Sequence, residues 1–541
     1  ERPAGPRVSA PMKIDCPTRI AEIDRTRDTA STACGERPQV HGEGSERARA
    51  VRFGVGAAAP SESRRGQFEL IAWLGLAVVA TFFTNLQAIS ACVVAANLST
   101  LVLVEKLQFL WSFVLVSAFV ALASGASTYG YLKSASFVVC LAIQIPLSVA
   151  FVCHRFAARR YPTAAWATLV FPCVHIAVWV VAMYTLPIGS TGNPAYSATD
   201  FLPVLQVAAV FGRNAVTFLL AWTAACGARA LVGGLQGARW AVRACTLAWA
   251  AIVLGGGIRL VAPHMFRNVY DWEGVMYQHQ VSCLSRGASM YEDTEERLRR
   301  KDTVIVHAES MSNAFGEGGT VVAKYIELLE KSYQNTSHDA VVVISETVGD
   351  KTWYDLVTRE GSQMRYAKNH PVPVIEAGLT PGPSPPSVVS ATLDWQRVKV
   401  TGSTCFDTDF PWLTRRVGGA DLWLETSATW SNIGERQFAA HKLVAIENGV
   451  TLVKCTKDGV TGAYDPHGNV LFRAPQTYGV AAFSIQGLKG GVGFPLAGIA
   501  FDVLTCLGGL AALAATCAAA RRPRSGRAAP PADGGDPEAA N

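Results

Sequence analysis

Two residues with reactive side chains stand at the ends of short β-branched runs, where a strand would hold them rigidly. Cys405 directly follows the run 398–404, and Glu309 comes just after the run 303–307. A cysteine at a strand end can act as a nucleophile, and a carboxylate held in the same way can accept its proton. Each residue also has a simpler interpretation. Cys405 could be a buried structural cysteine, and Glu309 could be a charge at a helix N-terminus. These residue types therefore permit covalent catalysis without requiring it.

A lysine and a second glutamate widen the set of candidates. Lys368 stands in the segment YAKNH (366–370), where by itself it reads as an ordinary surface lysine. Glu346 also stands just after a β-branched run, 340–344, and competes with Glu309 for the role of base.

The region 263–490 alternates strand-like and helix-like segments. β-branched runs predict strands, apolar residues at helical spacing predict helices, and the pair Asn448-Gly449 is a helix stop signal. The expected strands are 303–307, 340–344, 398–404, 420–424, 451–455, 461–464 and 470–472, the expected helices are 320–332 and 435–448, and a turn is expected at 465–468. Strands that alternate with helices and end in hairpins favour a layered αβ sandwich.

Composition changes sharply along the 541 residues, of which 50% are hydrophobic and only 17% charged. The chain is too long for one ordinary domain. We expect a disordered tail or targeting extension at 1–66, a membrane bundle at 67–262, a globular domain at 263–490, a last membrane helix at 491–520 and a disordered basic tail at 521–541.

The apolar segments are long enough to cross a membrane, which takes about 20 residues. Two helices are expected within 68–104, and one each at 108–124, 134–153, 163–186, 201–226, 240–261 and 499–519. Eight spans place the basic segments at 64–65, 154–160, 229–239 and 521–524 on one side of the membrane. By the positive-inside rule both termini are then cytoplasmic, and the globular domain lies on the opposite side. The net charge of +6 therefore reflects membrane topology and does not indicate nucleic-acid binding.

The 13 cysteines show no CxxC pair and no regular spacing, and most lie in apolar runs. Cys283, Cys405 and Cys455 are the three in the globular region, so we expect no disulfide framework. The histidines are scattered without metal-ligand spacing, and the sequence has no glycine-rich phosphate loop. We expect neither a metal nor a cofactor.

Longer blocks around the candidate residues resemble the nitrilase, or carbon–nitrogen hydrolase, superfamily. The blocks are VIVHAES (304–310), YAKNHPVPVIEAG (366–378), VKVTGSTCFDTDFPWLTR (398–415), GADLWLETSATW (419–430) and FAAHKLVAIENGVTLVKCTKDGVTGAYDPHGNVL (438–471). With seven apolar helices before the domain and one after it, the chain resembles the apolipoprotein N-acyltransferases, the membrane branch of that superfamily. The resemblance implies an α-helical membrane bundle of about eight transmembrane helices that carries an inserted αββα sandwich.

The resemblance also implies a role for each candidate. Cys405 would be the nucleophile, Glu309 the general base and Lys368 the cation beside the thiolate and the oxyanion, with Glu376 supporting the lysine. Glu346 is too close in sequence to Lys368 for the spacing usual in the family, so Glu309 is preferred.

Three further residues belong to the implied site. A backbone N–H near Phe406 would stabilise the oxyanion, and Phe406-Asp407 stands where Tyr-Glu is common in the family. Trp430 ends the fourth block. The apolar residues near the nucleophile could line an acyl channel, or they could be ordinary core and lid residues; they are Phe406, Phe410, Trp412, Leu413 and Trp430.

The implied chemistry is physically coherent. A thiol of ordinary pKa, about 8.5, is mostly protonated at neutral pH, so that a nearby lysine and a glutamate would be needed to activate it. The sulfur would attack an acyl carbonyl, and the acyl thioester would be resolved by an amine or by water.

Three functions remain in competition. The first is transfer of an acyl chain from a phospholipid to the α-amino group of a lipid-modified N-terminal cysteine on a lipoprotein, or to another amine. The second is a membrane-anchored amidase or nitrilase that acts on a small amide, and the third is a binding or scaffold protein without activity. The tethering of the domain to helices at both ends favours a lipid substrate, and the intact Glu309, Lys368 and Cys405 argue against the third function. We expect a monomer that works in the membrane.

Overall fold

The computed structural model describes eleven stretches of the chain: 62–86, 90–107, 110–132, 135–265, 277–285, 290–309, 319–393, 396–429, 431–475, 479–487 and 495–521. The tails expected at 1–66 and 521–541 lie almost wholly outside these ranges, and Trp430 also lies outside them.

The apolar region folds into helices at the places expected from the sequence. Its helices are α1 (Glu62–Leu86), α2 (Ser90–Lys106), α3 (Leu110–Leu132), α4 (Ala135–Arg160), η1 (Ala165–Leu169), α5 (Val170–Thr185), η2 (Pro194–Ala198), α6 (Leu202–Leu205), α7 (Ala208–Phe211), α8 (Arg213–Met265) and, after the globular domain, α13 (Pro495–Arg521). Gly234 interrupts α8 with a φ of 78°, a conformation that glycine adopts readily because it lacks a Cβ. The second part of α8 covers the helix expected at 240–261. The helix expected at 201–226 is broken into α6, α7 and the start of α8.

Five helices in the described part of the chain are long and apolar enough to cross a membrane. They cover Gly66–Phe83, Ser136–Arg160, Ala165–Thr185, Arg213–Ala262 and Leu496–Ala518. The segments Val114–Ala126 and Leu202–Phe211 are apolar but shorter. Eight membrane spans therefore stay a prediction.

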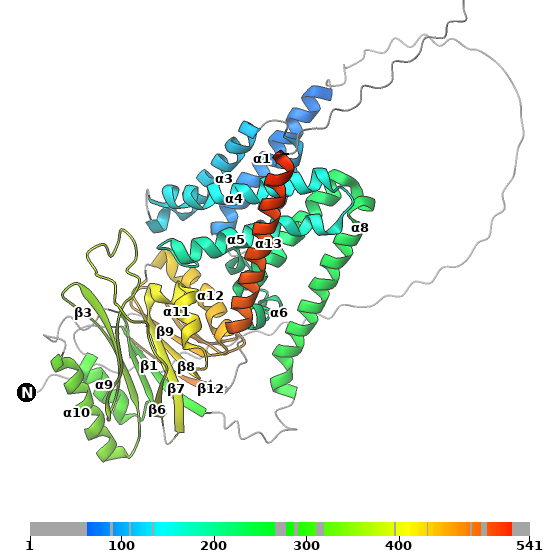
Figure 1. Ribbon diagram of the computed structural model, residues 1–541. Helices are drawn as coiled ribbons and strands as arrows, with labels where there is room; N and C mark the ends of the chain where they lie inside the picture. The colour runs from blue at the N-terminus through cyan, green and yellow to red at the C-terminus, as the bar shows by residue number, and fades with distance from the viewer. Residues whose placement is uncertain are drawn as a thin grey trace, which may run out of the picture. The chain divides into compact units, whose positions relative to one another are not determined.

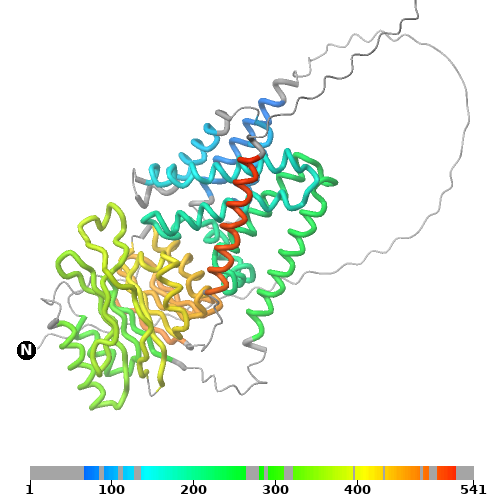
Figure 2. Tube along the Cα trace, in the orientation of Figure 1, coloured from blue at the N-terminus to red at the C-terminus, as the bar shows by residue number. Residues whose placement is uncertain are grey.

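Helices far apart in the sequence pack together in the bundle. Figure 2 shows α13, in red, beside α5. A Cβ on Gly509 of α13 would lie 3.0 Å from the Ala177 Cβ on α5, so the glycine permits a close approach of the two backbones. Small residues at helix–helix contacts are typical of membrane bundles.

The globular domain contains two six-stranded sheets. In strand order the first is β12 (Val480–Gly487), β1 (Tyr277–Leu284), β2 (Val304–His307), β3 (Val341–Val348), β4 (Lys351–Thr358) and β5 (Gly361–Ala367). The second is β11 (Val470–Pro475), β10 (Val460–Tyr464), β9 (Thr451–Thr456), β8 (Leu422–Ser427), β7 (Gln396–Thr404) and β6 (Val389–Leu393). The central strands β1–β2–β3 and β7–β8–β9 pair in parallel, and the outer strands pair antiparallel.

The two sheets face each other across an apolar core, with helices on their outer faces. The helices α9 (Met290–Arg299) and α10 (Gly319–Thr336) pack on the first sheet, and α12 (Ser431–Asn448) packs on the second (Figure 1). Between the sheets the Tyr354 hydroxyl donates to the Leu424 carbonyl at 3.0 Å. Gly402 has no room for a Cβ, because these two oxygens fill the space. The predicted αββα sandwich is confirmed as a layered arrangement.

The helix α12 contributes side chains to two hydrophobic cores. Val444 and Ala445 pack with Trp423 under the second sheet, whereas Leu443 and Ile446 pack with residues of α6 and α8, including Val204 and Val216. A helix that is apolar on opposite faces lies between two layers. The second sheet is thereby joined to the helices of the bundle.

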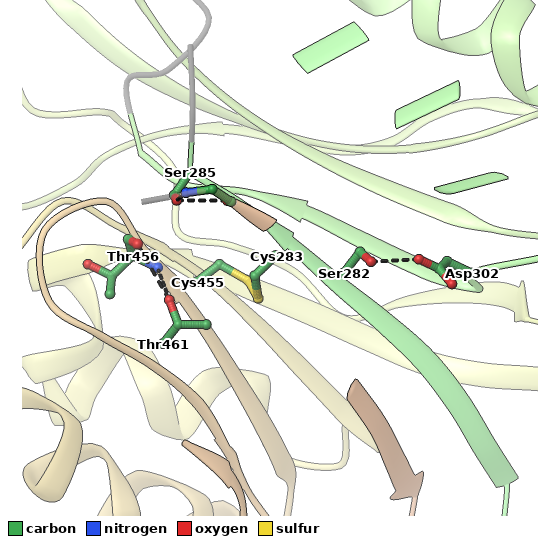
Figure 3. The surroundings of a disulfide bond; sticks show 8 residues. Ser282, Cys283, Ser285, Asp302, Cys455, Thr456 and Thr461 are labelled. Carbon is green, nitrogen blue, oxygen red and sulfur yellow. Dashed lines mark hydrogen bonds between the residues drawn. A yellow bond between two sulfur atoms is a disulfide. The ribbon is translucent and has the colours of Figure 1, made fainter. Parts of the chain in front are cut away.

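A disulfide joins the two sheets (Figure 3). Cys283 on β1 and Cys455 on β9 have Cα atoms 5.4 Å apart, a normal separation for a disulfide. Both side chains belong to the core between the sheets. We expected no disulfide framework from the cysteine spacing, and this bond corrects the expectation for these two residues. The pairing follows from the apposition of two strands 172 residues apart, which spacing along the chain cannot reveal.

The disulfide should contribute measurably to stability. The variant Cys283→Ala/Cys455→Ala is expected to melt about 5–15 °C lower than the wild type, since such bonds typically contribute about 2–4 kcal/mol. The measurement is the Tm of the detergent-solubilised protein with and without reductant. Reductant should lower the Tm of the wild type and of a Cys140→Ala control, and should not affect the double variant. Equal Tm values for oxidised and reduced wild type would contradict the prediction.

Candidate active site

Cys405 occupies a sharp turn at the end of β7. It opens the short helix η3 (Cys405–Asp409) with a φ of 47°, which is rare for a residue other than glycine. Such a backbone costs about 1–3 kcal/mol and persists only where its surroundings enforce it. Here the Ser403 hydroxyl holds the turn in place. It bonds the Thr408 hydroxyl at 2.6 Å and accepts from the Trp423 indole at 2.8 Å. A strained strand-to-helix turn of this kind is typical of a nucleophile.

A buried lysine is held between two carboxylates. The Lys368 ammonium lies 2.7 Å from the Glu309 carboxylate and 2.8 Å from the Glu376 carboxylate. The second oxygen of Glu309 accepts from the Ala428 backbone N–H at 3.0 Å, and that of Glu376 accepts from the Val372 N–H at 2.6 Å. Lys368 and Glu309 are almost wholly buried, whereas the Glu376 side chain is 22% exposed. The arrangement places Glu309 toward the interior and Glu376 toward the surface.

The three expected catalytic residues come from three different strand ends. Glu309 follows β2 of the first sheet, Lys368 follows β5 of the same sheet, and Cys405 follows β7 of the second sheet. The charges of Glu309 and Lys368 shift the pKa of the Cys405 thiol in opposite directions, as expected for side chains that lie near it. The Glu309 N–H donates to the Ser427 carbonyl at the end of β8, so that the strand ends of both sheets meet there.

The competing glutamate lies elsewhere. Glu346 is 3.8 Å from the Arg365 guanidinium, next to Asp355, and makes no ion pair with Lys368 among the described residues. Of the two glutamates, Glu309 is therefore the one that contacts Lys368.

Burial controls the protonation of the site. Burial raises the pKa of the Cys405 thiol to about 12, the Glu309 charge adds to the rise, and the ammonium groups of Lys368 and Lys454 oppose it. Burial also raises the pKa of the Glu309 carboxyl, against the effect of Lys368. Burial lowers the pKa of Lys368, but Glu309, Cys405 and Glu376 outweigh it, so that the lysine stays charged. A protonated thiol near a carboxylate can pass its proton to that carboxylate as it attacks.

Asp407 holds the loop that carries Lys368. Its carboxylate accepts from the backbone N–H groups of Asn369 at 2.9 Å and His370 at 2.7 Å. The His370 ring stacks on Phe410, with centroids 3.5 Å apart, and Phe406 meets Phe410 edge-on. Asp407 therefore holds the two residues that follow Lys368.

A second buried charge cluster, which we did not predict, lies beside Cys405. The Lys454 ammonium contacts the Glu425 carboxylate, the Ser427 hydroxyl at 3.1 Å and the Gln437 carbonyl oxygen at 3.2 Å. The Gln437 amide nitrogen lies 4.0 Å from the Cys405 sulfur. His441 lies 2.6 Å from Glu425, and with Lys454 it holds the pKa of that carboxyl below its ordinary value although burial alone raises it. A lysine inside the apolar strand TLVKCT was the available sequence signal.

The removal of Lys454 should destabilise the domain strongly. In Lys454→Met, Glu425 keeps its charge without its closest cation, and breaking such a buried pair costs about 3–5 kcal/mol. Arg473→Met is the control, because its ion pair with Glu435 is half exposed and should contribute less than about 1 kcal/mol. Chemical denaturation of both variants measures the difference. Similar losses in the two variants would contradict the role given to Lys454.

A cavity of about 370 Å³ connects Cys405 with the helix bundle. Its lining includes Cys405, Phe406 and Gln437 from the sandwich. It also includes residues of α1 to α5, such as Ala96, Val139 and His175. Of the residues expected along an acyl channel, Phe406 lines this cavity. Phe410 and Leu413 are buried in the core and are not among its described lining residues. For those two, the interpretation as core residues holds.

In the described part of the chain, no group of three or more His, Cys, Asp or Glu side chains could hold a metal ion.

Comparisons with known proteins give a likeness in structure alone. No family model matches the sequence, and no curated protein is similar to it. Solved structures of an amidase from Nesterenkonia sp. AN1 are similar to part of the chain. One, with acrylamide added at the active-site cysteine, is 17% identical over 38% of this chain and 92% of the amidase, with a TM-score of 0.31. Another, described as a mutant of this amidase from the nitrilase superfamily, is 16% identical over 40% of this chain and 93% of the amidase, with a TM-score of 0.33.

Proposed function

We propose that the chain is a membrane acyltransferase that moves a fatty acyl chain from a phospholipid, through a thioester on Cys405, to an amine. The acceptor is the α-amino group of the lipid-modified N-terminal cysteine of a lipoprotein, as the resemblance implies. The observation that carries the proposal is the cavity that joins Cys405 to residues of five apolar helices. A substrate that reaches a buried nucleophile from within a helix bundle is a lipid.

The first step forms the thioester. Glu309 accepts the Cys405 proton while the sulfur attacks an ester carbonyl of the phospholipid. Lys368 stabilises the negative charge on the carbonyl oxygen. The bond between the carbonyl carbon and the glycerol oxygen then breaks, and Glu309 returns the proton to that oxygen. The products are a lysophospholipid and an acyl-enzyme.

The second step consumes the thioester. The amine nitrogen attacks the thioester carbonyl, Glu309 accepts a proton from the nitrogen, and the carbon–sulfur bond breaks. The proton returns to the Cys405 sulfur, and the product is an amide. Water would compete with the amine, so the site must exclude it; Cys405 is only 3% exposed, which supports this requirement.

We also propose that the catalytic domain lies on the non-cytoplasmic side, with both termini in the cytoplasm. The positive-inside pattern of the basic segments supports this topology. The disulfide between Cys283 and Cys455 supports it independently, because disulfides form and persist in oxidising compartments.

Narrowing the cavity should separate lipid from small substrates. Ala96 of α2 lines the cavity, so Ala96→Phe is expected to slow acylation by phospholipid about tenfold or more, since overpacking costs about 1–3 kcal/mol. Acylation of Cys405 by a small soluble ester should change less than about twofold, because that substrate needs no space among the helices. Acylation by phospholipid is measured as release of lysophospholipid, and acylation by a small p-nitrophenyl ester is measured as release of p-nitrophenol.

Ala250→Phe is the matched control, because Ala250 is exposed on α8 and is not among the described residues that line the cavity. It should leave both rates unchanged. An equal effect of Ala96→Phe on both substrates would contradict a lipid route through the bundle. Turnover of a small amide without any reaction of phospholipid would favour a membrane-anchored amidase.

A further inference from the structure

Two hydrogen-bonding side chains of α5 face the cavity without a partner. His175 and Trp179 are one helical turn apart, and both line the cavity that contains Cys405. His175 is 3% exposed and Trp179 is 5% exposed. Both ring nitrogens of His175 and the indole nitrogen of Trp179 lack a hydrogen-bond partner among the described residues.

Unpaired groups of this kind are costly inside an apolar helix bundle. A buried donor without a partner loses about 1–3 kcal/mol relative to one that is satisfied, and the hydrocarbon chains of lipids offer no acceptor in place of water. The Asn193 side chain, which also lines the cavity, already bonds Asn214, Thr217 and the Ala195 N–H. The two rings therefore point to a bound acceptor.

The chemistry of the pair limits what that acceptor is. The indole N–H only donates, and a neutral imidazole donates from one nitrogen. The Phe171 ring packs against the His175 ring, with centroids 5.2 Å apart. The Trp179 ring packs close to Gly192, where a Cβ would lie 3.8 Å from it. These contacts fix the two rings. A hydrocarbon chain would leave both donors unsatisfied, whereas an oxygen atom of a lipid could accept from both.

We propose that His175 and Trp179 form a hydrogen-bonding subsite for an oxygen of the lipid acyl donor, either an ester carbonyl or a phosphodiester oxygen. The inference rests on the proposed function and adds to it a determinant of lipid position. If the polar part of the lipid is held at α5, the distance from that part to Cys405 is fixed. The subsite therefore determines which acyl ester of the lipid lies next to the Cys405 sulfur.

The test measures binding apart from catalysis. Full-length Cys405→Ser protein in detergent is titrated with phosphatidylglycerol, and the bound lipid is counted by native mass spectrometry. Trp179→Phe keeps the ring and removes the N–H, and His175→Leu removes both nitrogens. Each is expected to weaken lipid binding about fivefold or more in this background. Unchanged affinity in both variants would overturn the subsite.

Controls separate this result from misfolding. Trp222→Phe also removes an indole N–H, but one that already donates to the Thr168 hydroxyl at 3.1 Å, and Trp222 is not among the described residues that line the cavity. It should leave lipid affinity unchanged. A Tm for Trp179→Phe within about 2 °C of its parent excludes a general loss of fold. Equal losses of lipid affinity in Trp222→Phe and Trp179→Phe would overturn the subsite.

Diacylglycerol distinguishes the two oxygen sources, because it has ester carbonyls and no phosphate. If Trp179→Phe weakens diacylglycerol binding as well, the acceptor is an ester carbonyl; if it weakens phospholipid binding alone, the acceptor is the phosphodiester. Both results support the subsite. Failure of the proposed function is seen separately, as an absence of lysophospholipid release by the wild type in the presence of amine. Lipid binding that depends on His175 can still be measured in that case.

Discussion

Replacement of Cys405 by Ser or Ala is expected to lower lysophospholipid release by about 10⁴-fold or more. The reason is that the proposed mechanism holds the acyl chain on the Cys405 sulfur, which stands at the strained turn after β7 near the charges of Glu309 and Lys368. The measurement is the single-turnover release of lysophospholipid from purified protein in detergent.

The fold should survive this change. Ser and Ala are smaller than or similar in size to Cys, and the backbone at position 405 is held by contacts of Ser403 and Asp407 that the substitution leaves intact. Cys506→Ala, at a free cysteine of α13, is the control and should retain full activity. Activity of Cys405→Ala within tenfold of the wild type would remove Cys405 from the mechanism.

Glu309→Gln is expected to slow acylation by about 10²–10⁴-fold, the usual contribution of a general base. The amide is the same size as the carboxylate but cannot accept the Cys405 proton. Glu376 also contacts Lys368, but its side chain is partly exposed. Glu376→Gln should therefore lower the acylation rate about tenfold or less. The comparison identifies which carboxylate is the base.

The pH dependence should identify the same residue. Glu309 must be ionised to act, and burial raises its pKa above the ordinary value. The rate of wild-type acylation should therefore fall on acidification at a pH above the usual glutamate range. This acid limb should be absent from Glu309→Gln and retained in Glu376→Gln. Retention of the limb in Glu309→Gln, or equal losses in the two variants, would assign the base elsewhere.

The strands expected from the sequence correspond to β2, β3, β7, β8, β9, β10 and β11. The runs at β2, β3, β7 and β9 are rich in β-branched residues because both of their faces lie in apolar layers. The strands β1, β4, β5, β6 and β12 were missed. β5 (GSQMRYA) carries polar residues on its exposed face and begins at a glycine, so it reads as a loop when taken alone.

The candidate site was predictable only in part. Glu309, Lys368, Glu376 and Cys405 could be proposed from their blocks and the resemblance, and the structure brings the first three into direct contact. The ion pair of Lys454 with Glu425 depends on the register of β8 against β9, which no local pattern encodes. The disulfide and the cavity depend on the packing of whole layers, so they could not be derived from spacing.

The intact mass of the protein after incubation with phospholipid, in detergent and without an amine acceptor, tests the central claim most directly. The acyltransferase account predicts a mass gain of one acyl chain that neutral hydroxylamine removes and that Cys405→Ser lacks. Hydroxylamine cleaves thioesters under conditions that leave oxygen esters and amides intact, so lability identifies the bond as well as the adduct. An unmodified mass at full occupancy of lipid, together with turnover of a soluble amide, would contradict the account.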